Sequence, residues 1–189
     1  MDDLTPLLQR ATSAIEHAYF HIALDGGSPV YRERVYCYEL YHQLRKAWPE
    51  GTYFRLNGEL DKSAHHILRH LGAAFAKPDL LVHTPGDMGG NNTIIEVKSS
   101  GATKKGIKKD LETLALFRTA VGYKRAIYLL YGHEAEKAAN RVRKVAQEIG
   151  DLPPIELWLH TAPGEAASSV GLLAAATRRL TLLQGLPGK

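Results

Sequence analysis

Two short apolar segments each carry acidic residues at one end, and these residues suit the binding of a metal ion and a phosphate. The first segment opens with Pro78-Asp79, and the second, Thr93–Lys98, ends in Glu96-Val97-Lys98. Side chains of a β-strand alternate between its two faces, so Glu96 and Lys98 project from the same side. If the two segments pair, Asp79 joins them. Two carboxylates and an ammonium group would then converge, able to hold a hard divalent cation and to stabilise negative charge on a phosphate.

The predicted metal ligands are the carboxylates of Asp79 and Glu96 and the main-chain carbonyl of Val97. Mg²⁺ usually takes one or two protein carboxylates and fills its other positions with water and substrate oxygens, and Mn²⁺ is a substitute. Lys98 would position a water or stabilise charge in the transition state. In the alternative, Asp79 caps a turn and Glu96 and Lys98 form a surface ion pair. The apolar residues directly before Glu96 favour the metal site, because they indicate an acid that emerges from the core.

The elements that must position these residues follow from apolar periodicity and from turn formers. Helices are predicted over 3–24, 30–47, 104–121, 133–149 and, at the C-terminus, 166–184. Strands are predicted over 52–60, 78–84, 93–99, 124–131 and 155–160, with a turn at Asn57-Gly58 inside the first of them. This order predicts one α/β domain over 1–189, in which a mixed central sheet is flanked by helices. Its core covers about 30–160, and a helical tail follows at about 166–184.

The chain resembles the PD-(D/E)xK nuclease superfamily, which has the restriction-endonuclease-like fold. The resemblance is carried by Pro78-Asp79, by Glu96-Val97-Lys98, and by the order helix–three strands–helix–strand (αβββαβ) from about 30 to 131. It implies a metal-dependent phosphodiesterase with an extra N-terminal helix and C-terminal additions. Asp79 and Glu96 would be metal ligands and Lys98 the catalytic lysine. No Gln-x-x-x-Tyr pattern follows the start of the core helix, which argues against the RecB-like branch.

In many members of this superfamily a further acid joins the site from the helix before the first core strand. Glu39 is the candidate here, because it lies next to the apolar stripe of the helix predicted over 30–47. Its alternative role is that of a helix-surface acid. Glu59 is a second candidate, on or just after the first strand, and the sequence does not separate a position in the strand from one in a turn.

Basic residues gather directly after the predicted site. Between Lys98 and Arg125 there are eight basic and two acidic residues, although the net charge of the whole chain is only +4. Lys104, Lys105, Lys108 and Lys109 form two pairs at i, i+4 spacing on a predicted helix, where each could neutralise a phosphate. The alternative is a solvated helix face. The predicted partner is nucleic acid, with DNA favoured, and a homodimer or a larger complex suits an enzyme that cuts two strands.

Three functions fit these observations to different degrees. The leading one is a Mg²⁺-dependent endonuclease. The second is a catalytically inactive nuclease-fold subunit that binds nucleic acid in a defence or repair complex, and the third is a protein-interaction domain. The single cysteine, Cys37, excludes an intramolecular disulfide framework and favours a cytoplasmic location. The acidic start of the chain is unlike a signal peptide, and no apolar run approaches the roughly 20 residues of a membrane span, so no membrane partner is expected.

Overall fold

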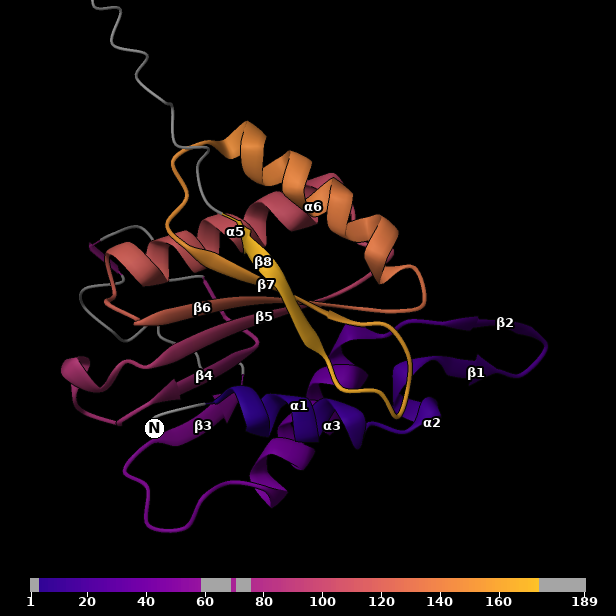
Figure 1. Cartoon of the computed structure of the whole chain (residues 1–189), viewed down its shortest axis with the longest axis horizontal. Coiled ribbons are helices and arrows are strands. Elements are labelled where there is room, and N and C mark those ends of the chain that lie inside the picture. Colours follow the sequence, from indigo (N-terminus) through magenta and orange to yellow (C-terminus); the bar gives the residue numbers. More distant parts are fainter. Residues whose placement is uncertain (1–3, 59–68, 71–75, 174–189) are drawn as a thin grey trace, which may run out of the picture.

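The computed structural model describes residues 4–58, 69–70 and 76–173, in which a six-stranded mixed sheet lies between two layers of helices (Figure 1). The strand order is β3-β4-β5-β6-β7-β8. The strands are β3 (Arg55–Gly58), β4 (Leu80–His83), β5 (Thr93–Ser99), β6 (Arg125–Tyr131), β7 (Ile155–His160) and β8 (Ser168–Leu173). β5, β6 and β7 are parallel to one another, whereas β3, β4 and β8 are each antiparallel to their neighbours. The predicted mixed α/β sheet is thus confirmed.

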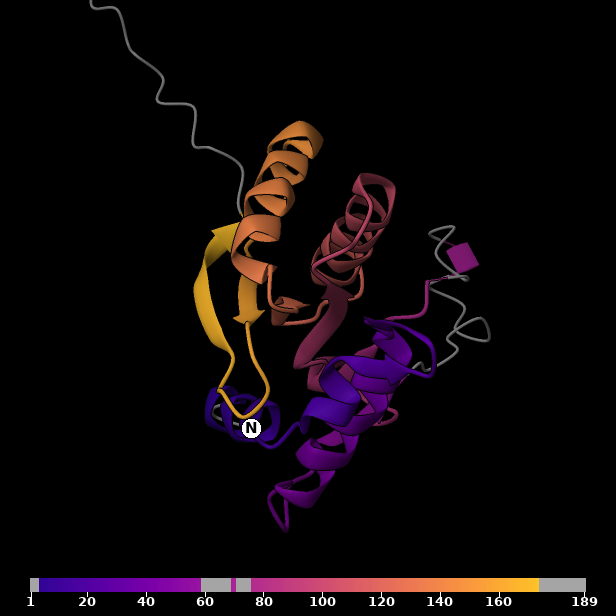
Figure 2. The ribbon, with the colours of Figure 1, turned by 90° about the vertical axis from the view of Figure 1, so that its right-hand side faces the viewer.

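Each face of the sheet is covered by its own pair of helices (Figures 1 and 2). Helices α5 (Lys104–Thr119) and α6 (Ala135–Ile149) pack on one face. Helices α1 (Thr5–Ser13) and α3 (Glu33–Lys46) pack on the other. The short helix α2 (His17–Phe20) leads into the hairpin of β1 (Ile22–Leu24) and β2 (Gly27–Val30), which extends beyond the sheet in Figure 1, and the 3₁₀ turn η1 (Met88–Gly90) lies between β4 and β5.

Strand β6 shows how the apolar runs divide between the two cores. It is buried on both faces, as expected of a central parallel strand. Tyr128 and Leu130 join the core under α5 and α6, whereas Ile127 and Leu129 join the core over α1 and α3. The same alternation places Ile94 of β5 under α5, so Glu96 and Lys98, in step with it, belong to the α5 side.

The predicted helices over 30–47, 104–121 and 133–149 are confirmed within a few residues, as are the strands over 78–84, 93–99, 124–131 and 155–160. The single helix predicted over 3–24 is wrong. That stretch forms α1, α2 and β1, because Phe20 turns inward to pack on Tyr131 and His160 and the chain then continues in the hairpin. Among the described residues, no helix is both long and apolar enough to cross a membrane.

Two further predictions are corrected at the edges of the sheet. Asn57-Gly58 does not form a turn, because both residues pair with β4 as the end of β3. Residues 168–173, predicted as part of the terminal helix, form strand β8, since pairing with β7 overrides their helical pattern. Gly171 has a φ of 120°, which an α-helix does not allow. The rest of that predicted helix, from residue 174, lies outside the described residues.

His160, at the end of β7, is fully buried and provides a test of the core through pH. Its Nδ1 lies 2.7 Å from the Oη of Tyr36, and burial lowers the pKa of His160 from 6.5 to about 4. Because the folded chain keeps this ring neutral, its stabilisation is complete above pH 6.5 and is lost as the pH falls from 6.5 towards 4. Between pH 7 and pH 5 we expect the free energy of unfolding to fall by about 2 kcal/mol more in the wild type than in His160→Gln. Denaturant titrations at both pH values measure this difference, and equal losses would contradict it.

Candidate active site

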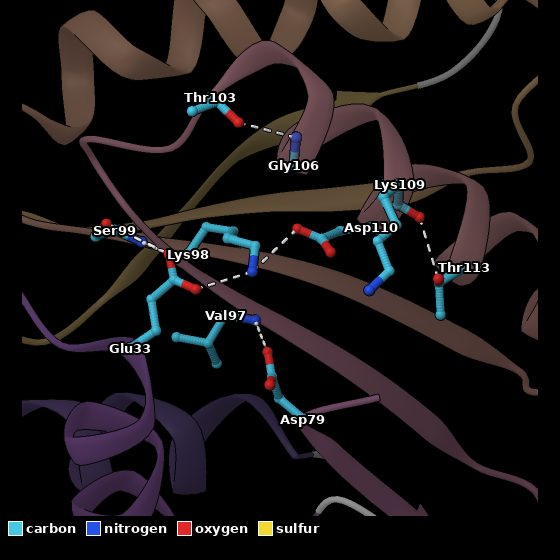
Figure 3. Close-up of polar contacts among 10 residues, drawn as sticks. All are labelled: Glu33, Asp79, Val97, Lys98, Ser99, Thr103, Gly106, Lys109, Asp110 and Thr113. Atoms are coloured by element: carbon cyan, nitrogen blue, oxygen red, sulfur yellow. Dashed lines mark hydrogen bonds and ion pairs between the residues drawn. The ribbon is translucent and has the colours of Figure 1, made fainter. Parts of the chain in front are cut away.

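The site begins where β4 and β5 separate. Their ladder ends with Leu80 opposite Ile95, so Asp79 and Glu96 are the next opposed residues. The Val97 main-chain N–H donates to Oδ2 of Asp79 at 2.7 Å, and the carboxylate therefore takes the place of a main-chain acceptor (Figure 3). Pro78, which has no N–H to continue the ladder, precedes it. The structure thus brings Asp79 next to the strand that carries Glu96 and Lys98.

Asp79 and Glu96 form a buried pair of acids. Only 5% of Glu96 is exposed, and burial, together with the negative charges of Asp79 and Asp110, raises the pKa of Glu96 well above its ordinary value. Burial also raises the pKa of Asp79, partly offset by its hydrogen bonds to the Val97 N–H and to Glu96. Two adjacent buried carboxylates are costly when both are charged, and a bound cation removes that cost.

Lys98 supplies the cation of the site. Its Nζ lies 2.9 Å from Oε2 of Glu33 and 3.4 Å from Oδ2 of Asp110 (Figure 3). Burial works against the charge on Lys98, but the hydrogen bond to Glu33 and the neighbouring acids outweigh it and raise the pKa of Lys98 above its ordinary value. Lys98 therefore stays protonated at neutral pH. It can donate hydrogen bonds and stabilise negative charge, but it is not suited to accept a proton from a water.

Glu33 is the acid that helix α3 contributes, and sequence reasoning missed it. It lies in the first turn of the helix, where a negative charge favours the helix dipole. Besides binding Lys98, its Oε1 accepts from the main-chain N–H of Ser99 at 3.3 Å and from the Ser99 hydroxyl at 3.4 Å. The sequence held no signal for this position. Only the structure places Cys37, one turn after Glu33, close enough to Asp79 and Glu96 that their charges, after burial, raise the pKa of Cys37.

Glu39, the predicted helix acid, is not brought to these residues. At about 100° per residue it lies about 240° around the helix from Glu33, and its Oε1 accepts from Nε2 of Gln43 at 2.6 Å. The acid of α3 that the structure places beside Lys98 is therefore Glu33, and Glu39 contacts its own helix instead. Glu59, the other candidate, lies outside the described residues.

Helix α5 and strand β6 add two buried polar side chains. Asp110 stands within the apolar stripe of α5 and is 5% exposed, and burial raises the pKa of Asp110 to about 6. Its Oδ2 faces Lys98 as an ion pair without hydrogen-bond geometry. Tyr128 is paired with Glu96 in the parallel register, and its buried hydroxyl has no hydrogen-bond partner among the described residues. The only sequence signal was for Asp110, an acid within an apolar stripe. Tyr128 had no such signal.

The two buried acids fit a Mg²⁺ ion better than a metal held wholly by protein ligands. Among the described residues, no group of three or more His, Cys, Asp and Glu side chains is placed to hold a metal. Mg²⁺ does not need such a group, because water and substrate oxygens complete its shell. Asp79 and Glu96 would hold it. Val97, whose carbonyl was the third predicted ligand, is buried in β5 with its N–H bound to Asp79.

Within the described part of the chain, the four predicted phosphate-binding lysines of α5 divide into two that are paired with acids and two that are not. Thr103 caps the helix by accepting from the Gly106 N–H at 3.1 Å, so the helix begins beside the site. Lys104 lies 2.7 Å from Glu148 of α6, and Lys108 lies 3.5 Å from Glu112. Lys105 and Lys109 are exposed and form no ion pair with the described residues, and Figure 3 shows the side chain of Lys109 extending beside Asp110.

This division predicts unequal contributions to nucleic-acid binding. We expect Lys105→Ala/Lys109→Ala to weaken binding and to reduce the slope of log K against log salt by about 1.5, because two phosphate contacts are lost. Lys104→Ala/Lys108→Ala changes the net charge by the same amount and is the matched control, with little expected change in slope. Binding titrations across salt concentrations measure both. Equal slopes for the two double variants would contradict the division.

A hollow of about 320 Å³ opens beside these groups, between the start of α3 and the start of α5. It is lined by Glu33, Lys98, Ser99, Gly101, Ala102, Thr103 and Gly106. The Glu33 carboxylate, the Lys98 ammonium group and the main chain before a capped helix therefore meet at one accessible place. Comparison with models of known protein families gives no match, and comparison with curated protein sequences gives none either.

Proposed function

We propose that the chain is a metal-dependent nuclease that hydrolyses phosphodiester bonds, with DNA as the favoured substrate. The observation that carries this proposal is the buried Asp79–Glu96 pair with the protonated Lys98 next to it. The order α3-β3-β4-β5-α5-β6 supports a restriction-endonuclease-like core, and it agrees with the resemblance in Pro78-Asp79 and Glu96-Val97-Lys98. A buried acid pair has little value for stability alone, because its charges repel each other.

Each residue has a role that follows from its surroundings. Asp79 and Glu96 would hold Mg²⁺, which, when bound, lowers the pKa of a water and neutralises charge on the phosphate. Lys98 donates hydrogen bonds to the charge that develops on the phosphate oxygens. Glu33 and Asp110 hold the ammonium group from two directions, and Glu33 also fixes the main chain at Ser99. The ammonium group of Lys98 therefore has a defined position before substrate arrives, which reduces the reorganisation needed in the transition state.

The surface next to these residues suits a polyanion. Lys105 and Lys109 are exposed lysines of α5 that form no ion pair with the described residues, and the hollow at Glu33 and Lys98 opens between α3 and α5. A nucleic-acid strand that follows these lysines would place a phosphate at Asp79 and Glu96. Neutralised phosphates contribute most of the affinity in such contacts and make it dependent on salt.

Incubation of the purified chain with plasmid and with single-stranded DNA tests the proposal. We expect cleavage with Mg²⁺ or Mn²⁺ and none with EDTA, and a parallel preparation of Glu96→Gln controls for contaminating nucleases. Salt-dependent binding without cleavage under any of these metal conditions would overturn the nuclease proposal and favour the inactive nuclease-fold subunit. Absence of both binding and cleavage would leave no support for a nucleic-acid role.

A further inference from the structure

A second hollow adjoins the acid pair on the side away from α5. Its volume is about 370 Å³, and it is lined by Cys37, Tyr38, Tyr41, Asn57, Gly58, Asp79 and Leu80. We call it the β3 pocket. It lies between helix α3 and the neighbouring strands β3 and β4, and Asp79 stands in its wall. Its volume is at the small end of the range for ligand sites, which suits a group of the size of a nucleobase or a nucleotide.

The lining of the β3 pocket is aromatic and amide-bearing rather than basic. Tyr38 is 62% exposed, and Tyr41 lies one turn further along the same side of α3. The Oδ1 of Asn57 lies 2.9 Å from Nε2 of His83, which fixes the orientation of the amide. Among the lining residues that the structure describes, Asp79 is the only charged one, and its carboxylate would repel a phosphate. A flat, uncharged ring with polar edges fits these groups, because it can stack on tyrosine and hydrogen-bond to an amide.

The two hollows are lined by different residues of helix α3 and of the strands that carry the site. Glu33 lines the first and Cys37 lines the β3 pocket, and these residues are one turn apart on α3. Lys98 belongs to the first hollow and Asp79 to the β3 pocket. A strand whose backbone passes the lysines of α5 and whose phosphate sits at Asp79 and Glu96 would therefore carry its next base towards Tyr38.

We propose that the β3 pocket binds one unpaired nucleobase next to the cleaved phosphodiester, so that the chain prefers single-stranded DNA or DNA with an unpaired nucleotide at the cut. The proposal rests on the proposed nuclease function, and it names the substrate class for that site. A base inside a duplex is paired and stacked, and moving it into a pocket costs a few kcal/mol, whereas an unpaired base enters at much lower cost.

Two substitutions test the pocket without touching the carboxylates or Lys98. Tyr38→Ala removes an exposed ring that could stack on a base. Gly58→Val fills the pocket from its wall: a Cβ at Gly58 would lie 3.5 Å from the Asp79 carbonyl oxygen, 3.7 Å from Leu80 Cδ2 and 3.9 Å from Tyr41 Cδ2, all ordinary contact distances. The backbone therefore accepts a side chain there, and valine suits a strand. Tyr53→Ala is the matched control, because Tyr53 is 85% exposed and is not part of the lining.

The experiment measures binding of a short single-stranded oligonucleotide and of its blunt duplex, and then cleavage of both with Mg²⁺. For Tyr38→Ala and Gly58→Val we expect single-strand binding to weaken about tenfold, within the range for loss of one stacked base. Their duplex binding should stay unchanged. Tyr53→Ala should bind both substrates as the wild type does. If the wild type cleaves DNA but neither pocket substitution weakens single-strand binding, the pocket does not bind a base. The nuclease proposal would then be unaffected. Pocket-dependent single-strand binding without cleavage would support base binding and overturn the nuclease.

Discussion

Replacing Glu96 with glutamine is expected to reduce metal-dependent cleavage on the order of 10³-fold without weakening the fold. Glutamine keeps the shape of the side chain but removes a charge that Mg²⁺ would need. The fold should tolerate this, because burial and the neighbouring charges of Asp79 and Asp110 already oppose ionisation of Glu96. Without metal, the variant should therefore have a Tm equal to or above that of the wild type.

The decisive measurement combines cleavage rate with thermal unfolding in the presence and absence of Mg²⁺. Metal should stabilise the wild type by about 1.4 kcal/mol at ten times its Kd, and should leave Glu96→Gln unchanged. Glu112→Gln is the matched control, since Glu112 is an exposed acid of α5 paired with Lys108. If Glu96→Gln were still stabilised by Mg²⁺ and still cleaved DNA, the metal site would not be at Glu96.

The parts of the fold that follow from local pattern could be predicted from the sequence. Strand β6 reads as a central strand because seven consecutive residues avoid charge from Ala126 onwards to Gly132, and α6 has a continuous apolar stripe. The pairing of β4 with β5 was the condition on which the predicted site depended, and the structure confirms that pairing. In these cases local preference and tertiary packing favour the same structure.

Other elements depend on partners that are distant in the sequence. Residues 168–173 were predicted as part of a helix, although Val170 and Gly171 are poor helix formers, and they pair with β7 along the edge of the sheet. Asn57-Gly58 has the composition of a turn, yet β4 extends it as a strand. Asp110 was visible only as a charge in an apolar stripe, and its role beside Lys98 required the packing of α5 on β5. The β3 pocket combines residues from α3, β3 and β4, which no local pattern connects.

Helix α3 shows that a helix can be predicted correctly while the residue that faces the site is not. The helix was predicted within a few residues, but the acid that faces the site depends on rotation about the helix axis. Glu33 and Cys37 share one side, and Glu39 lies on another. Rotation is set by which residues the core buries, here Tyr36, Leu40 and Leu44, and both glutamates border that buried stripe. Sequence reasoning chose Glu39 and missed Glu33, because the rotation of the helix is not read from the local pattern.

Cleavage by Glu33→Gln and by Glu39→Gln distinguishes which of the two glutamates of α3 belongs to the site. We expect Glu33→Gln to lower the cleavage rate about 10- to 100-fold, as is typical when a group that orients a site residue is lost, and Glu39→Gln to leave it within about twofold. Glu33 holds Lys98 at 2.9 Å and also binds the main chain at Ser99, whereas Glu39 contacts Gln43 of its own helix.

The reason for the loss also predicts its form. Without the charge of Glu33, the ammonium group of Lys98 retains Asp110 at 3.4 Å, so it stays near the site but is held from one direction instead of two. The loss should therefore appear in kcat more than in KM, because Lys98 acts on charge that develops in the transition state. Steady-state cleavage by both variants, with unfolding curves to show intact folds, measures this. If Glu39→Gln proved the weaker enzyme, the acid of α3 would be Glu39 and the sequence-based choice would be right.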